Sequence, residues 1–117
     1  MSTIALDFDG VLSDYQGWRG PTVLADPVPG AFQAIRDYQD AGLEVCIYTS
    51  RADTPAAKRH LEDWFYRHGL ERKRVVKIQI TNLKPPALVY LDDRAWQFRG
   101  AFPAPEEILA FRTWQGH

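Results

Sequence analysis

The chain has little of the features that would tie a protein to a disulfide framework or to a membrane. Among its 117 residues there is one cysteine, Cys46, so no disulfide can form within the chain. No apolar run approaches the roughly 18 residues that a membrane-spanning helix needs. The amino-terminal apolar run has no basic segment before it and is interrupted by Asp7, which argues against a signal peptide. We therefore expect a soluble, cytoplasmic protein without membrane contacts.

An excess of charge of one sign is also missing. The 14 basic and 15 acidic residues give a formal net charge of −1, so no overall attraction to nucleic acid or anionic lipid is expected. What is present is typical of a globular chain, with 45% apolar and 13% aromatic residues. A length of 117 residues is also usual for one domain. We therefore expect a single domain over residues 1–117.

Short apolar runs alternate with helical patterns after a glycine-rich and proline-rich loop at 13–29. The patterns predict strands at 4–6, 43–48, 75–80 and 88–91, with a short fifth strand at 97–102. They predict helices at 30–41, from the N-cap Thr54 up to Gly69, and at 105–114. This alternation predicts an α/β fold, a Rossmann-like three-layer sandwich with a mainly parallel sheet.

One connection is unusually short for a parallel sheet. Seven residues separate Ile80 from Leu88, whereas a parallel crossover normally takes a dozen or more. Either 75–80 is not a regular parallel strand, or the connection there is abbreviated.

Polar side chains follow three of the predicted strands. Asp7 and Asp9 end the first strand, Thr49 and Ser50 the second, and Asp92 and Asp93 the strand at 88–91. Because ligands of parallel α/β sheets bind beyond the carboxyl ends of the strands, these side chains predict a site at that edge. Crowded carboxylates repel and raise each other's pKa, so a cation or a chemical role is expected to offset the cost.

The stretch Asp7-Phe8-Asp9-Gly10-Val11-Leu12 resembles motif I of the haloacid dehalogenase (HAD-like) superfamily over all six positions. The later motifs of that superfamily are matched in the same order. Thr49 resembles the motif II hydroxyl, Lys84 the motif III lysine, and Asp92-Asp93 the acidic pair of motif IV.

This resemblance implies a magnesium-dependent phosphatase. Asp7 would be the nucleophile that forms an aspartyl-phosphate, and Asp9 would protonate the leaving group and then activate water. Thr49 would hold a phosphoryl oxygen, and Lys84 would screen negative charge, with Lys73 and Lys77 as substitutes. The resemblance implies that Mg²⁺ is held by Asp7, the main-chain carbonyl of Asp9, and Asp92 or Asp93.

A second set of residues is expected to contact substrate. It comprises Gly10, Ser50, Arg51 and Arg94. Either arginine could hold phosphate bidentately or pair with a nearby carboxylate. Tyr15, Trp18 and Arg19 could stack on a base or sugar, although packing against a neighbouring helix is the favoured interpretation.

Three alternatives stay open. A response-regulator receiver domain has a similar residue set, but there the acceptor aspartate ends the third strand. Asp92-Asp93-Arg94 is similar to the acidic motif in the 3′-phosphatase domain of bacteriophage polynucleotide kinases, so nucleic-acid ends are a candidate substrate. The chain could also be a non-catalytic phosphate-binding module.

The spacing of the motifs leaves no room for a cap domain. The 36 residues between Leu12 and Thr49 already contain the glycine-rich loop and a helix, and Thr49 to Lys84 has room for one helix and one strand. An open site cannot exclude water by closing on a small ligand. We therefore expect a large phosphorylated substrate, such as a macromolecule, or a neighbouring subunit of a homo-oligomer to cover the site.

Overall fold

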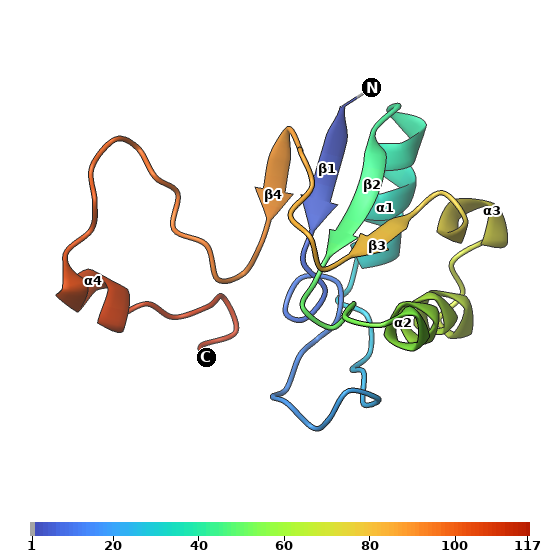
Figure 1. Ribbon diagram of the computed structural model, residues 1–117, viewed down its shortest axis with the longest axis horizontal. Coiled ribbons are helices and arrows are strands. Elements are labelled where there is room, and N and C mark those ends of the chain that lie inside the picture. The colour runs from blue at the N-terminus through green and yellow to red at the C-terminus, as the bar shows by residue number, and fades with distance from the viewer. Residues whose placement is uncertain (1) are drawn as a thin grey trace.

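A four-stranded parallel sheet forms the centre of the computed structural model, which describes residues 2–117. The strands are β1 (Thr3–Leu6), β2 (Glu44–Tyr48), β3 (Gln79–Thr81) and β4 (Val89–Leu91). Their order across the sheet is β3-β2-β1-β4, and every neighbouring pair is parallel (Figure 1). The predicted α/β fold with a parallel sheet is confirmed.

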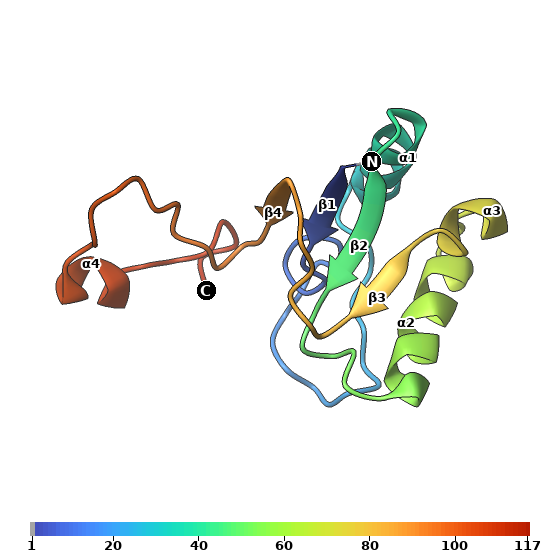
Figure 2. The ribbon, with the colours of Figure 1, turned by 45° about the horizontal axis from the view of Figure 1, so that its top comes forward.

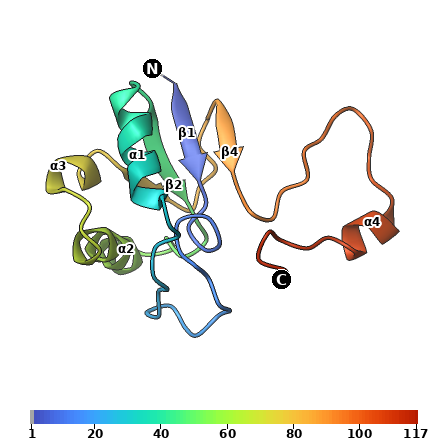
Figure 3. The same ribbon diagram turned by 180° about the vertical axis from the view of Figure 1, so that it is seen from behind.

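Three helices cover one face of this sheet. They are α1 (Ala31–Asp40), α2 (Pro55–Arg67) and α3 (Arg72–Val75). Seen from behind, α1 lies in front of the sheet (Figure 3). Side chains in register on neighbouring parallel strands point to the same face, so Ile4, Leu6, Val45 and Ile47 form one apolar surface. The buried helix residues that share a core with them are Ala31, Ile35, Leu61, Trp64, Phe65 and Val75.

The best-marked helix of the sequence forms as predicted. Thr54 Oγ1 accepts a hydrogen bond from the Ala57 N–H at 3.0 Å, and Pro55 is the first helical residue of α2. Trp64 of this helix is fully buried, packs edge-on against Phe8, and donates its Nε1–H to the Ala25 carbonyl at 2.8 Å. The glycine-rich loop is thereby attached to the core.

The opposite face of the sheet is crossed by a single loop. Residues 82–88 run from β3 at one edge of the sheet to β4 at the other (Figure 1). This short segment is the abbreviated connection, one of the two alternatives that the sequence left open. Tyr90 donates its hydroxyl to the Pro85 carbonyl and holds the loop on this face. Within residues 2–117 no helix covers this face, so the predicted third layer stays a prediction.

Three predicted elements are wrong in extent or type. The strand predicted at 75–80 begins in a helical turn. The N–H groups of Arg74 and Val75 both donate hydrogen bonds to the Glu71 carbonyl, so Val75 is helical. Val75 enters the core from this turn and Val76 is 63% exposed, so the strand begins only at Gln79.

The other two corrections concern the C-terminal quarter. Residues 97–102 form no strand, because they lie away from the sheet and have no neighbouring strand to pair with. The helix predicted at 105–114 is α4 (Pro105–Leu109), and it ends there without burying a side chain. Without a surface to pack against, an amphipathic pattern gives only a short helix.

Residues 95–112, here called the arm, leave the sheet after β4 and pass through α4 before the chain returns toward β1 (Figures 1 and 2). The Cα radius of gyration is 14.9 Å, against about 13.4 Å expected for a compact domain of this length. Among the described residues, no helix has the length and apolar character needed to cross a membrane.

Candidate functional site

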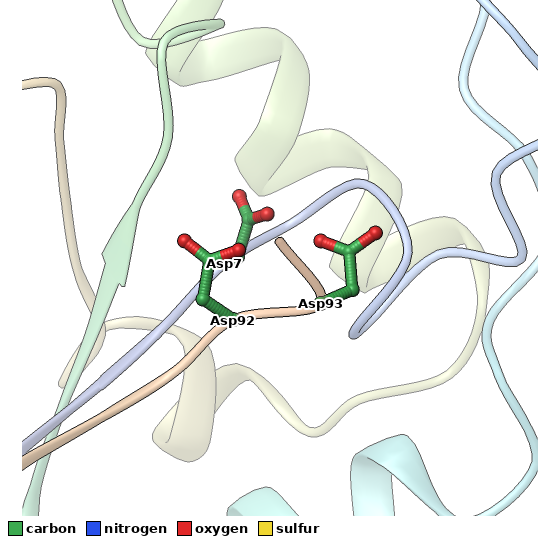
Figure 4. A group of neighbouring side chains, drawn as sticks. All are labelled: Asp7, Asp92 and Asp93. Carbon is green, nitrogen blue, oxygen red and sulfur yellow. The ribbon is translucent and has the colours of Figure 1, made fainter. Parts of the chain in front are cut away.

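The parallel pairing of β1 with β4 brings together the acidic ends of two distant segments. Leu6 is in register with Leu91, so the next residues, Asp7 and Asp92, leave the sheet side by side. The Asp7 N–H donates to the Leu91 carbonyl at 2.9 Å and continues this pairing. One carboxylate oxygen from each of Asp7, Asp92 and Asp93 lies within 4.8 Å of the others (Figure 4). We call these three residues the acidic cluster.

The turn that follows β1 is shaped to admit Asp93. The Phe8 carbonyl accepts hydrogen bonds from the N–H groups of Val11, Leu12 and Ser13, which curls the chain tightly. Gly10 has a φ of 82°, and a Cβ placed there would lie 2.2 Å from Asp93 Oδ2. Glycine is therefore required at this position for two reasons, its left-handed backbone and its close approach to a carboxylate.

Burial and crowding perturb the ionisation of Asp7. Burial, followed by the negative charge of Asp92, raises the pKa of Asp7 from 3.8 to about 7. A hydrogen bond with Asp93 and the charge of Asp93 also contribute to this raised pKa, whereas the Phe8 N–H, 2.8 Å from Asp7 Oδ1, lowers it. Without a cation, Asp7 therefore keeps its proton to a higher pH than an ordinary carboxyl group does.

The donor set fits a hard divalent cation. Mg²⁺ is bound through one or two carboxylates, waters and substrate oxygens. Asp93 Oδ1 is buried and has no hydrogen-bond partner among the described residues, and such an atom is costly unless something binds it. The unpartnered oxygen and the raised pKa of Asp7 both indicate that the cluster lacks a positive charge.

The side chain of Asp9 takes no part in the acidic cluster. Its Oδ2 accepts from Arg51 Nε at 2.7 Å, and its Oδ1 accepts from the Ser13 hydroxyl at 3.4 Å. The Arg51 side chain is 5% exposed, and its guanidinium lies 4.6 Å from the centre of the Trp18 ring. Of the two roles considered for Arg51, pairing with a carboxylate is the one seen, and Trp18 packs on that pair rather than on a helix.

Thr49 and Ser50 lie where the sequence predicts, at the end of β2. Thr49 is buried, its N–H donates to the Thr81 carbonyl at 2.9 Å, and its Oγ1 accepts from the Arg51 N–H at 3.2 Å. The hydroxyl of Thr49 keeps its own proton to donate. Ser50 is exposed.

Among the described residues, the side chains of two expected cations form no ion pair with the acidic cluster. Lys84 Nζ lies 5.0 Å from the centre of the Tyr90 ring, on the face that the 82–88 loop crosses. The side chain of Arg94 is exposed, although its N–H donates to Asp92 Oδ1 at 2.8 Å. Within residues 2–117 neither cation forms an ion pair with a carboxylate.

The substitutes considered for Lys84 lie at the wrong end of the sheet. Lys73 and Lys77 line a cavity of about 540 Å³ together with Thr3 and Glu44, the first residues of β1 and β2. The acidic cluster lies at the carboxyl ends of the strands, so neither lysine can act on it from this position.

The chain end contributes contacts that the sequence did not indicate. Trp114 Nε1 donates to the Gly10 carbonyl at 2.7 Å, and Gln115 Nε2 donates to Asp14 Oδ1 at 2.7 Å. These residues are about 100 positions apart, and no motif links them. The two contacts attach the returning chain to the turn that carries Gly10.

The raised pKa of Asp7 predicts a pH dependence of stability in chelator. A folded-state pKa of about 7 above an unfolded value of 3.8 means that unfolding releases a proton between these values. The free energy of unfolding contributed by Asp7 therefore falls as pH rises from about 4 to about 7, and levels off above that. Asp7→Asn, which cannot ionise, should remove this loss.

Urea unfolding in chelator at about pH 5 and about pH 8 measures the effect. The difference between the two pH values should be smaller for Asp7→Asn than for wild type. Asp63→Asn, on the exposed side of α2, is the matched control and should keep the wild-type difference. Equal pH dependence in wild type and Asp7→Asn would contradict the proposed crowding.

The acidic cluster also predicts stabilisation by Mg²⁺. A cation that binds only the folded state adds about 2.7 kcal/mol at 100 times its Kd. For a domain of this size that is a rise in Tm on the order of 10 °C. Asp92→Asn and Asp93→Asn should each reduce the rise, and Asp63→Asn should leave it unchanged. Calorimetric melting with and without Mg²⁺ tests this, and an unchanged wild-type Tm at saturating metal would exclude the site.

No model of a known protein family, no curated protein and no solved structure matches this chain. The chemistry open to the site therefore follows from its own carboxylates, from the buried Thr49 hydroxyl and from the Arg51–Asp9 pair.

Proposed function

We propose that the chain is a magnesium-dependent phosphomonoester hydrolase of the HAD-like type, with Asp7 as its nucleophile. The observation that carries this proposal is the position of Asp7, which ends β1 with the carboxylates of Asp92 and Asp93 beside it. It is supported by the motif-like stretch 7–12, whose Gly10 accommodates Asp93 at van der Waals distance. A carboxylate nucleophile attacking a phosphate dianion needs nearby positive charge, which a cation held by these residues would supply.

The proposed reaction has two steps. Once Arg51 has left Asp9 and Asp9 has taken a proton from solvent, an Asp7 carboxylate oxygen bonds to phosphorus while the bond from phosphorus to the ester oxygen breaks, and Asp9 gives that proton to the leaving oxygen. A water molecule then gives a proton to Asp9 and bonds to phosphorus. The bond from phosphorus to Asp7 breaks, which releases inorganic phosphate and restores the Asp7 carboxylate.

The role proposed for Asp9 requires its side chain to turn. Both of its carboxylate oxygens already accept hydrogen bonds, from Arg51 and from Ser13. We propose that substrate phosphate draws Arg51 from Asp9, because a guanidinium binds phosphate oxygens as readily as a carboxylate. Asp9 would then be free to face the leaving oxygen, and Arg51 would take the phosphate-binding role.

The roles of Thr49 and Lys84 differ in how much movement they need. The buried Thr49 hydroxyl has a proton to donate and lies at the end of β2, next to β1. Lys84 would have to leave the Tyr90 ring and reach around the sheet edge, which the exposed loop 82–88 permits only by rearranging. Lys84 therefore remains the least supported member of the proposed set.

One observation favours a non-catalytic phosphate-binding module as the second candidate. The Arg51–Asp9 pair is 2.7 Å long and the Trp18 ring lies over the Arg51 guanidinium, so the proposed general acid is already occupied by an ion pair. If this pair persists with substrate bound, the site can hold a phosphate but has no group to protonate a leaving oxygen.

Hydrolysis of an aryl phosphate in Mg²⁺ separates the two candidates. Turnover should stop with chelator, and Asp7→Asn should abolish it because the nucleophile is lost. Asp9→Asn should lower kcat on the order of 100-fold or more, the usual scale of general acid–base catalysis. Asp63→Asn should have wild-type activity.

Full turnover by Asp7→Asn would show that Asp7 is not the nucleophile. Mg²⁺-dependent binding of phosphate without any turnover would favour the phosphate-binding module.

The open site predicts a preference for large substrates. Among residues 2–117 no cap domain covers the carboxyl ends of β1 and β4, and Trp18 is 61% exposed beside Arg51. An exposed indole can stack on a base, with a contribution of about 1–3 kcal/mol. We therefore expect kcat/KM to be higher on oligonucleotides with a 3′-phosphate than on sugar phosphates, and Trp18→Ala to reduce that difference. A value near ~10⁶ M⁻¹s⁻¹ on one small metabolite, in the normal enzyme range, would contradict this.

A further inference from the structure

The C-terminal third of the chain presents apolar side chains to solvent instead of burying them. The last apolar residue of the core is Ile80. Within residues 2–117 fifteen large apolar side chains are exposed, and eleven of them lie after Ile80, so the exposure is concentrated in one part of the molecule. We call this set the C-terminal apolar surface: Leu83, Leu88, Val89, Tyr90, Leu91, Trp96, Phe98, Phe102, Ile108, Leu109 and Trp114.

Part of this surface is an uncovered stretch of the sheet. Val89 and Leu91 are in register with Ile4 and Leu6, so they point to the face that the helices cover. Ile4 and Leu6 are buried there, whereas Val89 and Leu91 are 45% and 37% exposed, because the helix layer ends before it reaches β4. An apolar sheet face is normally packed against another layer of structure, and at β4 this layer is missing.

Another part of the surface lies on the arm, residues 95–112. Phe102 is 88% exposed, and its ring lies 4.9 Å from that of Phe98, which is itself exposed. Leu109 of α4 is 80% exposed. These side chains lie on a projecting loop whose two ends are held, by β4 at one end and by the Trp114–Gly10 hydrogen bond at the other. A loop closed at both ends presents its apolar side chains in a defined arrangement.

The amount of exposed surface matches what a dimer buries. The accessible surface is 7591 Å², against roughly 6,500 Å² expected for a folded monomer of 13.4 kDa. The excess is roughly 1,100 Å², and a standard protein–protein interface takes about 800 Å² from each partner.

The charge of this region favours a protein partner. Residues 83–117 contain four basic and four acidic side chains, Lys84, Arg94, Arg99 and Arg112 against Asp92, Asp93, Glu106 and Glu107. Because these charges cancel, residues 83–117 have no excess positive charge with which to attract nucleic acid or anionic lipid. One chain carries both an apolar arm and an uncovered apolar sheet edge, so two copies can cover each other without a further component.

We propose that the chain forms a two-fold symmetric homodimer in which the arm of each copy packs against β4 of the other. Phe102 and Leu109 supply apolar contacts, and Val89 and Leu91 receive them. The same surface serves on both copies, so the interface closes with two chains and does not propagate into a filament. This inference does not depend on the proposed phosphatase reaction.

Sedimentation equilibrium on the full chain at concentrations on the order of 10–100 µM tests the dimer. The expected mass is about 27 kDa, twice that of the 13.4 kDa chain. Phe102→Glu and Leu109→Glu, each placing a charge in the apolar contact, should weaken self-association on the order of 100-fold or more. Both residues are exposed outside the core, so circular dichroism should show an unchanged monomer fold.

Val76→Glu is the matched control, since Val76 is 63% exposed at the end of α3 and lies outside the C-terminal apolar surface. It should associate like wild type. A monomeric wild type would overturn the proposal, as would a dimer that survives both arm substitutions or one that Val76→Glu dissociates, because the interface would then lie elsewhere.

Discussion

The parallel pairing of β1 with β4 is the constraint on which the candidate site depends. It joins segments more than 80 residues apart, and its register places Asp7 beside Asp92 at the same sheet edge. A shift of one residue in that register would turn β4 over and send Asp92 to the other face. The pairing holds although the carboxylates beside it repel, because backbone hydrogen bonds join the strands at both ends, from the Leu88 N–H to the Thr3 carbonyl and from the Asp7 N–H to the Leu91 carbonyl. These backbone bonds therefore keep the carboxylates crowded at the strand ends, and a bound cation would relieve the repulsion.

A second constraint acts on the other carboxylate of the motif. Arg51 reaches from the turn after β2 to Asp9 after β1, and its remaining contacts are with the glycine-rich loop, through Trp18 and through the Gly20 carbonyl at 3.5 Å. One guanidinium thus connects two strand ends and a loop that has no regular structure of its own. Because a nearly buried guanidinium is costly to leave unpaired, any ligand that takes Asp9 from Arg51 has to supply an anion in its place. A phosphate group meets that requirement.

The sequence predicted the parts of the fold whose patterns are local. Thr54, Pro55 and Gly69 mark the two ends of α2, and the apolar runs before Asp7 and Thr49 form β1 and β2 as expected. The strand predicted at 75–80 is wrong in extent because Val75 is the last residue of α3 and Val76 is 63% exposed, so the alternation of Val76, Ile78 and Ile80 does not mark one buried strand face. For the candidate site, the sequence predicted the residues that directly follow strands. These are Asp7 after β1, and Asp92 and Asp93 after β4. The contacts of Asp9 and Lys84 could not be predicted. They depend on the positions of long side chains and of the irregular glycine-rich loop, and these are fixed by tertiary packing rather than by a local sequence pattern.

The arm and the acidic cluster are linked through the chain. Asp93 lies two residues before the first residue of the arm, and beyond the far end of the arm the Trp114 side chain donates a hydrogen bond to the Gly10 carbonyl. Gly10 is the residue against which the Asp93 carboxylate packs. A partner that holds the arm in one position would therefore restrain both residues of this contact. It would restrain Asp93 through the adjoining backbone and Gly10 through the hydrogen bond from Trp114. Because linkage between two equilibria is reciprocal, a cation that orders Asp93 against Gly10 would also favour the arm position that a second copy recognises. The spacing of the motifs leaves no room for a cap domain. Through this coupling, formation of the dimer rather than closure of a lid would fix the position of Asp93 in the site.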